Sequence, residues 1–361
     1  MRNRFRLLLV FFVVLTQIFL AAGTGQAAQI IRRPTRGRIY HGDFPGRLTA
    51  AQTQISVASQ QSYVQTVGKS VAWVYFSNDW FRGKHFPLKT ATWIRSRGAV
   101  PYIRLNIRSS ANGLPEPVYT LKRIANGDFD VYLRRWARDA RDFNYPLMVE
   151  YGFEVNGRWE PWNGFWNGRN IWSGGNPNIP DGAETFVTAY RRIVDLMREE
   201  GAHNITWVFH ANDRNNPNNV KWNQLQWYYP GADWVDWVGV SVYGPQTSGE
   251  PYDAQFPEAM DVIYKRVLRL APNKPVIVSE MGVVAGNPLV NQANWTQRAL
   301  NHLIARRWPN VIGFTWWNNG EVNFLDTFRV QDHPALAEVF RRRVADEPRV
   351  LGRPIFTKSK R

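Results

Sequence analysis

Short apolar runs rich in β-branched and aromatic residues recur along the chain, and amphipathic segments separate most of them. Such runs are typical of buried strands, whereas apolar residues every three or four positions are typical of helices packed on a core. Alternating strands and helices predict a parallel sheet, and eight such units predict a single-domain α/β fold, the (β/α)8 TIM barrel. The predicted strands cover residues 38–41, 71–76, 100–107, 147–153, 205–210, 235–243, 275–279 and 311–316.

The two ends of the chain differ in composition from the predicted barrel. Residues 1–27 combine three arginines, an apolar run and a small-residue segment, which is typical of a secretory signal peptide. An uncleaved membrane anchor is the alternative, although the run is short for crossing a bilayer. We expect a signal peptide over 1–27, the catalytic barrel over 28–345 and a loose basic tail over 346–361, in a secreted or periplasmic protein.

Charge and cysteine content narrow the possible chemistry. The 361 residues carry a formal net charge of +16 and include no cysteine, which excludes disulfides, zinc–thiolate sites and thiol nucleophiles. The positive charge is diffuse, so a solvated surface is the simplest explanation. Attraction to anionic lipid, acidic polysaccharide or nucleic acid is the alternative. We expect a monomer with a polysaccharide substrate, no nucleic-acid partner and no stable membrane insertion after signal cleavage.

Two glutamates end apolar runs, where a carboxylate is unusual without a chemical reason. Glu154 ends the fourth predicted strand and Glu280 ends the seventh. Catalytic groups of a (β/α)8 barrel lie at the carboxyl ends of its strands. Two carboxyl groups about 5 Å apart suit a glycosidase that retains anomeric configuration. The alternative for either glutamate is a buried acid paired with an arginine.

The segments around these glutamates resemble a known family. Glu-Val-Asn-Gly-Arg-Trp-Glu-Pro-Trp over 154–162 is similar to the acid/base signature of glycoside hydrolase family 26, and Ser-Glu-Met-Gly over 279–282 is similar to its nucleophile segment. The resemblance implies an eight-stranded barrel with Glu154 as acid/base and Glu280 as nucleophile. It also makes β-mannan the first expected substrate, with mixed-linkage glucan or xylan as alternatives.

Two residues depart from the family's pattern. Phe153 stands where the family usually has histidine, and Glu150 stands where it often has arginine. Strand alternation places Glu150, Gly152 and Glu154 on the inner face of the barrel. Because a buried charge needs a partner, we expect Arg104 on the third strand to form an ion pair with Glu150.

The two catalytic roles require different environments. A general acid needs a raised pKa, and apolar walls from residues such as Trp159 and Trp162 could supply this for Glu154. Glu280 must stay ionised as a nucleophile. Tyr243, at the end of the sixth strand, could donate a hydrogen bond to it.

Aromatic and amide side chains in the predicted loops suit a sugar ligand. Indole faces stack on sugar rings, and amides bond to hydroxyls. Core packing is the alternative for any tryptophan, and a structural role is the alternative for the histidine. Neither metal-ligand spacing nor a phosphate loop occurs, so we expect no metal and no other cofactor. The predicted substrate-binding residues are Trp159, Trp162, Asn156, His210, Asn212, Tyr243 and Trp317.

Three functional hypotheses follow. The first is a secreted, retaining endo-β-glycanase, a glycoside hydrolase of the mannanase type. The second is a carbohydrate-binding barrel without catalysis, and the third is an envelope protein that processes an acidic exopolysaccharide. Binding to an acidic polymer should weaken with salt because ions screen long-range attraction. Hydrolysis of a neutral glycan should not.

Overall fold

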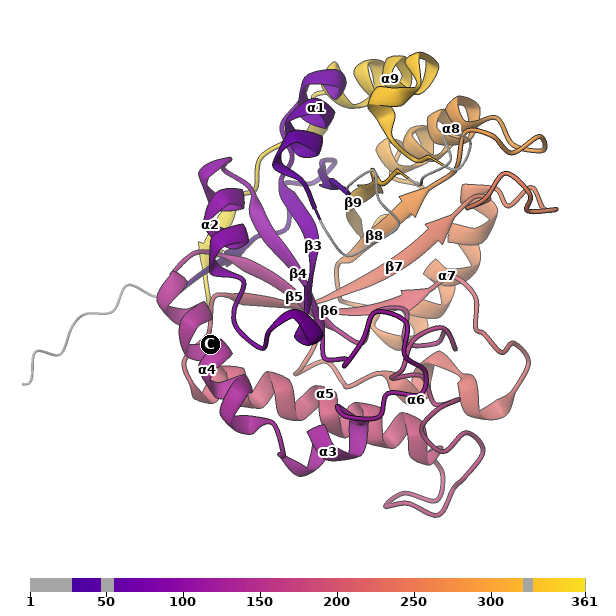
Figure 1. Ribbon diagram of the computed structural model, residues 1–361. Coiled ribbons are helices and arrows are strands. Elements are labelled where there is room, and N and C mark those ends of the chain that lie inside the picture. The colour runs from indigo at the N-terminus through magenta and orange to yellow at the C-terminus, as the bar shows by residue number, and fades with distance from the viewer. Residues whose placement is uncertain (1–27, 47–54, 321–326, 361) are drawn as a thin grey trace, which may run out of the picture.

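A closed parallel barrel forms the centre of the protein (Figure 1). The computed structural model describes residues 28–46, 55–320 and 327–360, so the predicted signal peptide lies outside the described residues. The barrel closes because β2 pairs in parallel with both β3 and β9. Its eight strands are β2 (Ile39–Phe44), β3 (Trp73–Asp79), β4 (Val100–Asn106), β5 (Leu147–Tyr151), β6 (Ile205–Asn212), β7 (Trp237–Tyr243), β8 (Val276–Gly282) and β9 (Val311–Trp317).

Helices follow the strands and cover the outside of the barrel (Figure 1). This arrangement confirms the predicted (β/α)8 fold. Within the described residues no helix is both long and apolar enough to cross a bilayer. The helices are α1 (Val57–Val67), α2 (Leu88–Ser96), α3 (Leu121–Asn126), α4 (Asp130–Phe143), α5 (Asp181–Glu199), α6 (Leu225–Tyr228), α7 (Phe256–Leu270), α8 (Gln292–Ile304) and α9 (Pro334–Phe340), with short turns η1 (Trp80–Arg82), η2 (Lys221–Asn223), η4 (Val330–Asp332) and η5 (Arg341–Ala345).

Each of the eight predicted strands overlaps an observed one, but β5 is shorter than expected. It ends at Tyr151, and Gly152 then adopts a φ of 69°. This left-handed conformation favours glycine, and a Cβ at this position would lie 2.3 Å from the ring of Phe186. The chain therefore leaves the strand before it reaches Glu154, so the expected alternation through Gly152 and Glu154 is wrong.

Two apolar layers surround the barrel wall. One large cluster fills the space between the strands and the helices, and a second fills the inside of the barrel. The inner cluster includes Tyr40, Trp73, Trp237 and Ile277, which lie near the amino-terminal ends of their strands. The apolar floor leaves the carboxyl-terminal half of the barrel for polar side chains.

The basic tail is docked, not loose. β10 (Val350–Leu351) pairs in parallel with β2, and β11 (Phe356–Lys358) pairs antiparallel with β1 (Gln29–Ile31). The tail also contains an acid that offsets part of its positive charge. This acid is Glu347, which accepts a hydrogen bond from Nε of Arg349 at 2.7 Å. Backbone pairing therefore makes residues 350–358 part of the fold, which the charge pattern did not indicate.

Gly42 offers a test of packing inside the barrel. A Cβ on Gly42 would lie 2.1 Å from Nε1 of Trp73, which donates to Oγ1 of Thr315 at 2.8 Å. We expect Gly42→Ala to lower the free energy of unfolding by about 1–3 kcal/mol because the core cannot accept the extra atom. Gly249→Ala is the matched control, since its Cβ would meet no atom within 4 Å. Urea unfolding measures the free energy of unfolding of both variants. Equal values for Gly42→Ala and Gly249→Ala would contradict the packing argument.

Candidate active site

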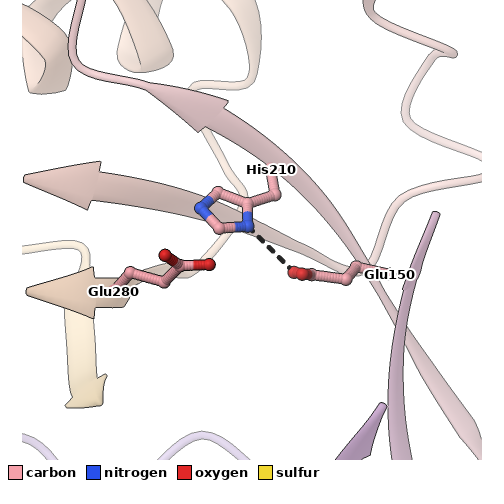
Figure 2. Close-up of side chains that lie close together, drawn as sticks. All are labelled: Glu150, His210 and Glu280. Carbon is pink, nitrogen blue, oxygen red and sulfur yellow. Dashed lines mark hydrogen bonds and ion pairs between the residues drawn. The ribbon is translucent and has the colours of Figure 1, made fainter. Parts of the chain in front are cut away.

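Glu150 of β5 lies fully buried in the polar half of the barrel. Its carboxylate accepts hydrogen bonds from Tyr102 at 2.5 Å, from Nδ1 of His210 at 3.0 Å, and from Tyr75 in a shorter contact. Figure 2 shows Glu150 and His210 pointing toward one another. Burial acts to raise the pKa of Glu150, but His210, Arg104 and Tyr102 together hold this pKa below its ordinary value. Glu150 therefore exists as a buried carboxylate with a complete set of partners.

His210 of β6 is the imidazole partner of this carboxylate. Burial acts to lower the pKa of His210, but the charge of Glu150 raises it above the ordinary value. Its second ring nitrogen, Nε2, lies 2.8 Å from the hydroxyl of Ser241. Because the side chain is fully buried and both nitrogens are bonded, the structure favours the structural role over the predicted contact with substrate.

Arg104 of β4 lies between two carboxylates. Its Nε donates to the hydroxyl of Tyr75 at 2.9 Å and lies 3.7 Å from Oε1 of Glu150. The predicted ion pair with Glu150 is thus present, but it lies beyond hydrogen-bond distance and Tyr75 bridges it. The closer partner of Arg104 is Glu280, which receives a short hydrogen bond from the guanidinium. The sequence did not indicate this second pair, although Arg104 was already expected on the inner face.

A β-bulge positions Glu280 on β8. Ser241 of β7 pairs with Glu280, whereas the residue before Ser241 pairs with Val278, so Ser279 is an extra residue in the strand. The bulge allows two consecutive side chains to enter the barrel, because Oγ of Ser279 lies 2.8 Å from the hydroxyl of Tyr102. Bulges commonly redirect a side chain in this way beside active sites.

Glu280 is held by several groups inside the barrel. Tyr243 donates to Oε2 at 2.8 Å, which confirms the predicted hydrogen bond, and the hydroxyl of Tyr75 lies 3.0 Å from Oε1. Burial raises the pKa of Glu280, the charge of Arg104 opposes this, and the charge of Glu154 adds to it. The pKa of Glu280 is raised overall, whereas a readily ionised group was expected. Arg104 is therefore the main source of stabilisation for the ionised form.

Glu154 lies in the loop after β5 and not on the strand. Its φ of 48° is left-handed, which is uncommon for a residue other than glycine or asparagine. Two donors hold the carboxylate, Nε1 of Trp159 at 2.6 Å and Nδ2 of Asn212 at 3.0 Å. Trp159 is 40% exposed, so the carboxylate lies beside an open indole. Trp159 and Asn212, which were both predicted to bind substrate, thus lie at the site, and their contact with a substrate stays a prediction.

Asn156 and Trp162, which were predicted to bind substrate, support the loop. Asn156 is completely buried, and its Nδ2 donates to the carbonyls of Asn212 and Arg214 at 3.0 Å each. Trp162 is 2% exposed and donates to the carbonyl of Phe153 at 2.8 Å. Their polar groups complete the backbone bonding of the segment that carries Glu154, and contact with a substrate stays a prediction for both.

Trp317 at the end of β9 is also mostly covered. Its ring stacks on Phe44 with centroids 3.9 Å apart, and 5% of the residue is exposed. The guanidinium of Arg104 lies 5.3 Å from the ring centre. Trp317 therefore forms part of the wall around the charged residues, and its contact with a substrate stays a prediction.

Glu150, His210 and Glu280 place their ligand atoms within 4.8 Å of one another (Figure 2), and they are the one group with metal-ligand geometry in the described part of the chain. The ligand atoms of this group already bond to other protein side chains. Glu150 bonds to His210, and Glu280 bonds to Arg104. We interpret the group as an ion-pair network.

Comparison with known proteins identifies the family and the fold. Residues 119–298, about half of the chain, match the model of glycosyl hydrolase family 26. Endoglucanase H of Acetivibrio thermocellus is 28% identical over 227 residues, which are 62% of this chain and 23% of that protein. A β-1,3-xylanase of a Vibrio species is 28% identical over 126 residues, which are 35% of this chain and 23% of that protein. The chain thus spans about a quarter of the length of these curated relatives.

A solved structure extends the likeness to the whole barrel. A family 26 β-mannanase from Bacteroides ovatus matches with a TM-score of 0.60 and 15% identity, covering 88% of this chain and 90% of that one. This likeness confirms the fold.

Removal of Arg104 tests the buried charge network. Arg104→Met deletes the cation between two buried carboxylates, so we expect the free energy of unfolding at about pH 7 to fall by about 3–5 kcal/mol. Without Arg104 the folded-state pKa of Glu280 rises further above its ordinary value of 4.5. A raised folded-state pKa favours folding below the unfolded value and loses this contribution as pH rises, so the deficit should be smaller at about pH 4.

The matched control is Arg298→Met. Arg298 pairs with Glu258 on the surface, where both side chains are about half exposed or more, and such pairs contribute less than about 1 kcal/mol. Urea unfolding of both variants at the two pH values measures the difference. An equal loss at both pH values for Arg104→Met would contradict the charge argument.

Proposed function

The chain belongs to glycosyl hydrolase family 26, and from this premise we propose that it is a retaining endo-β-glycanase that hydrolyses a β-linked polysaccharide by double displacement. The observation that carries the proposal is the pair of carboxyl groups at the carboxyl end of the barrel. Glu154 follows β5 and Glu280 lies on β8, and the charge of Glu154 raises the pKa of Glu280. Two acids placed together at the carboxyl end of a barrel suit glycosidic bond cleavage.

The environments of the two acids support different roles. Glu280 is 4% exposed and oriented by Tyr243 and Arg104, which suits a nucleophile that attacks the anomeric carbon while the glycosidic C–O bond breaks. Glu154 lies in a loop beside the open indole of Trp159. It would donate a proton to the leaving oxygen and then, as a carboxylate, take a proton from the water that releases the glycosyl-enzyme.

The neighbours of Glu154 support an acid/base function in geometric terms. Trp159 and Asn212 each donate to a different oxygen of the carboxylate, so the group has a fixed orientation before substrate arrives. Catalysis benefits when groups are oriented in advance. We propose that the exposed face of Trp159 also stacks on a sugar ring.

β-Mannan is the first substrate that we propose, with mixed-linkage glucan and xylan as the alternatives. The relatives named above are an endoglucanase, a β-1,3-xylanase and a β-mannanase. Their names share the β-glycan class and differ in the sugar. The family match therefore supports the class, and the choice of sugar needs an experiment.

Two substitutions test the catalytic pair. Wild type and both variants are incubated with β-mannan, mixed-linkage glucan, xylan and an acidic exopolysaccharide, and new reducing ends are measured. We expect Glu280→Gln to abolish release from the active polymer because the nucleophile is lost. We expect Glu154→Gln to lower the rate by about 10²–10⁴-fold. Glu258→Gln, at an exposed position, is the control and should keep the wild-type rate.

A glycoside with a good leaving group separates the two roles. With a 2,4-dinitrophenyl glycoside of the polymer's sugar, the first step needs no proton donor. Glu154→Gln should therefore still release dinitrophenol in a rapid phase equal to the enzyme concentration, whereas Glu280→Gln should not. Wild-type activity in both variants would contradict the assignment, and binding without hydrolysis by all proteins would favour a carbohydrate-binding barrel.

We also propose that residues 1–27 direct export and are removed. Three arginines before the apolar run, followed by small residues, support this. Expression in a bacterial host with periplasmic fractionation provides the test. We expect soluble periplasmic protein whose intact mass lacks about the first 27 residues. Full-length protein that remains in the membrane fraction would indicate an anchor instead.

A further inference from the structure

The carboxyl ends of β3 and β4 carry a buried polar group of side chains that the reaction above does not use. We call Asp79, Asn106, Arg108 and Glu160 the rim cluster. Asp79 ends β3 and pairs in register with Asn106, which ends β4 two residues after Arg104. Strand alternation therefore puts Asp79 and Asn106 on the inner face, on the side where the reaction occurs.

The rim cluster is bonded internally but incompletely. Oδ1 of Asp79 accepts from Asn106 at 2.9 Å and from Arg108 at 3.3 Å, and Arg108 lies 3.9 Å from Oε2 of Glu160. Four buried atoms have no hydrogen-bond partner among the residues that the structure describes. They are Oδ2 of Asp79, Oδ1 of Asn106, Nε of Arg108 and Oε2 of Glu160.

Such atoms call for a ligand because buried polar groups in native proteins are nearly always bonded. Asp79 is 3% exposed, Asn106 is 0% exposed and Glu160 is 7% exposed, so bulk water does not satisfy them. The free positions are three oxygens and one N–H group. A sugar hydroxyl both donates and accepts, so a ring with several hydroxyls matches this set.

The rim cluster lies beside the catalytic pair. The charges of Arg104, Glu154 and Glu280 all act on Glu160, whose pKa burial raises to about 8. Glu160 also belongs to the same loop as Glu154. A sugar unit next to the cleaved bond would therefore reach these side chains.

We propose that the rim cluster is a subsite for a neutral, hydroxyl-rich sugar ring of the glycan; the proposal rests on the glycanase function above. Arg108 already faces the carboxyl groups of Asp79 and Glu160. Arg82 also lies 4.0 Å from Oδ2 of Asp79, so both cations here already face protein carboxyl groups. A sugar carboxylate would meet the acid Asp79 without an unengaged cation beside it, and like charges brought together are unfavourable. The subsite thus selects a neutral glycan even though the chain as a whole is basic.

Calorimetric titration with matched oligosaccharides tests the subsite. Glu154→Gln serves as the parent so that ligands are not hydrolysed, and folding of every protein is checked by circular dichroism. The ligands are mannopentaose, cellopentaose and xylopentaose, together with β-1,4-linked pentamannuronate and pentaglucuronate, which add a carboxylate to the first two. We expect a neutral pentaose to bind at least about tenfold more tightly than its uronate counterpart.

Substitutions in the parent identify the residues. Glu160→Leu should weaken binding of the best neutral pentaose by about tenfold or more, because it removes a hydrogen bond and leaves a sugar hydroxyl unpaired. Glu160→Gln keeps polar atoms there and should stay within about threefold of the parent. Asp79→Asn keeps Oδ1, changes the unpartnered Oδ2, and should weaken binding by about tenfold even if Glu160→Leu does not fold. Glu258→Gln is the surface control.

Three outcomes would overturn the proposal. These are tighter binding of a uronate, unchanged neutral binding in Glu160→Leu and Asp79→Asn, and no binding of any neutral pentaose to the parent. The result is independent of catalysis, because a protein that binds neutral pentaoses through the rim cluster but releases no reducing ends would refute the glycanase function and keep the subsite.

Discussion

The balance of charge inside the barrel is the constraint on which the active site depends. Glu150 and Glu280 are buried at 0% and 4% exposure, and an isolated carboxylate in such a place is strongly unfavourable. Arg104 supplies a positive group, His210 bonds to Glu150, and Tyr75 connects Arg104 to both acids. A network that spans several strands thus holds the carboxyl groups of Glu150 and Glu280, and each member is positioned by the register of the barrel.

This network also explains how the chain departs from its family's pattern and keeps the site. The family often has arginine where this chain has Glu150, and here Glu150 lies 3.7 Å from Arg104 of the neighbouring strand. Phe153 stands where histidine is usual, and its ring lies 3.7 Å from the guanidinium of Arg104. A cation over an aromatic face is stabilised by the ring quadrupole. The two departures are therefore related, because Glu150 and Phe153 both lie against the guanidinium of Arg104.

Periodicity was sufficient to predict the barrel, since apolar strands alternate with amphipathic helices along the chain. The ends of the predicted strands were also sufficient to predict the hydrogen bond from Tyr243 to Glu280, whereas the catalytic roles of Glu154 and Glu280 stay predictions. Periodicity could not indicate the bulge at Ser279 or the left-handed turn at Glu154, because both depend on pairing between distant strands. The burial of Trp162, at 2% exposure, was missed for a related reason, since composition suggests that a loop residue is open while packing decides its exposure.

The docking of the tail has a consequence for how the protein is made. Gln29 pairs with Lys358, and β2 is completed by β9 and β10, so the first strands find their partners only in the last part of the chain. A chain that emerges with its N-terminus first cannot close this barrel until nearly all of it is available. Contacts between distant residues also form slowly. The barrel of a newly made chain therefore stays open until its last strands are available to pair with β1 and β2.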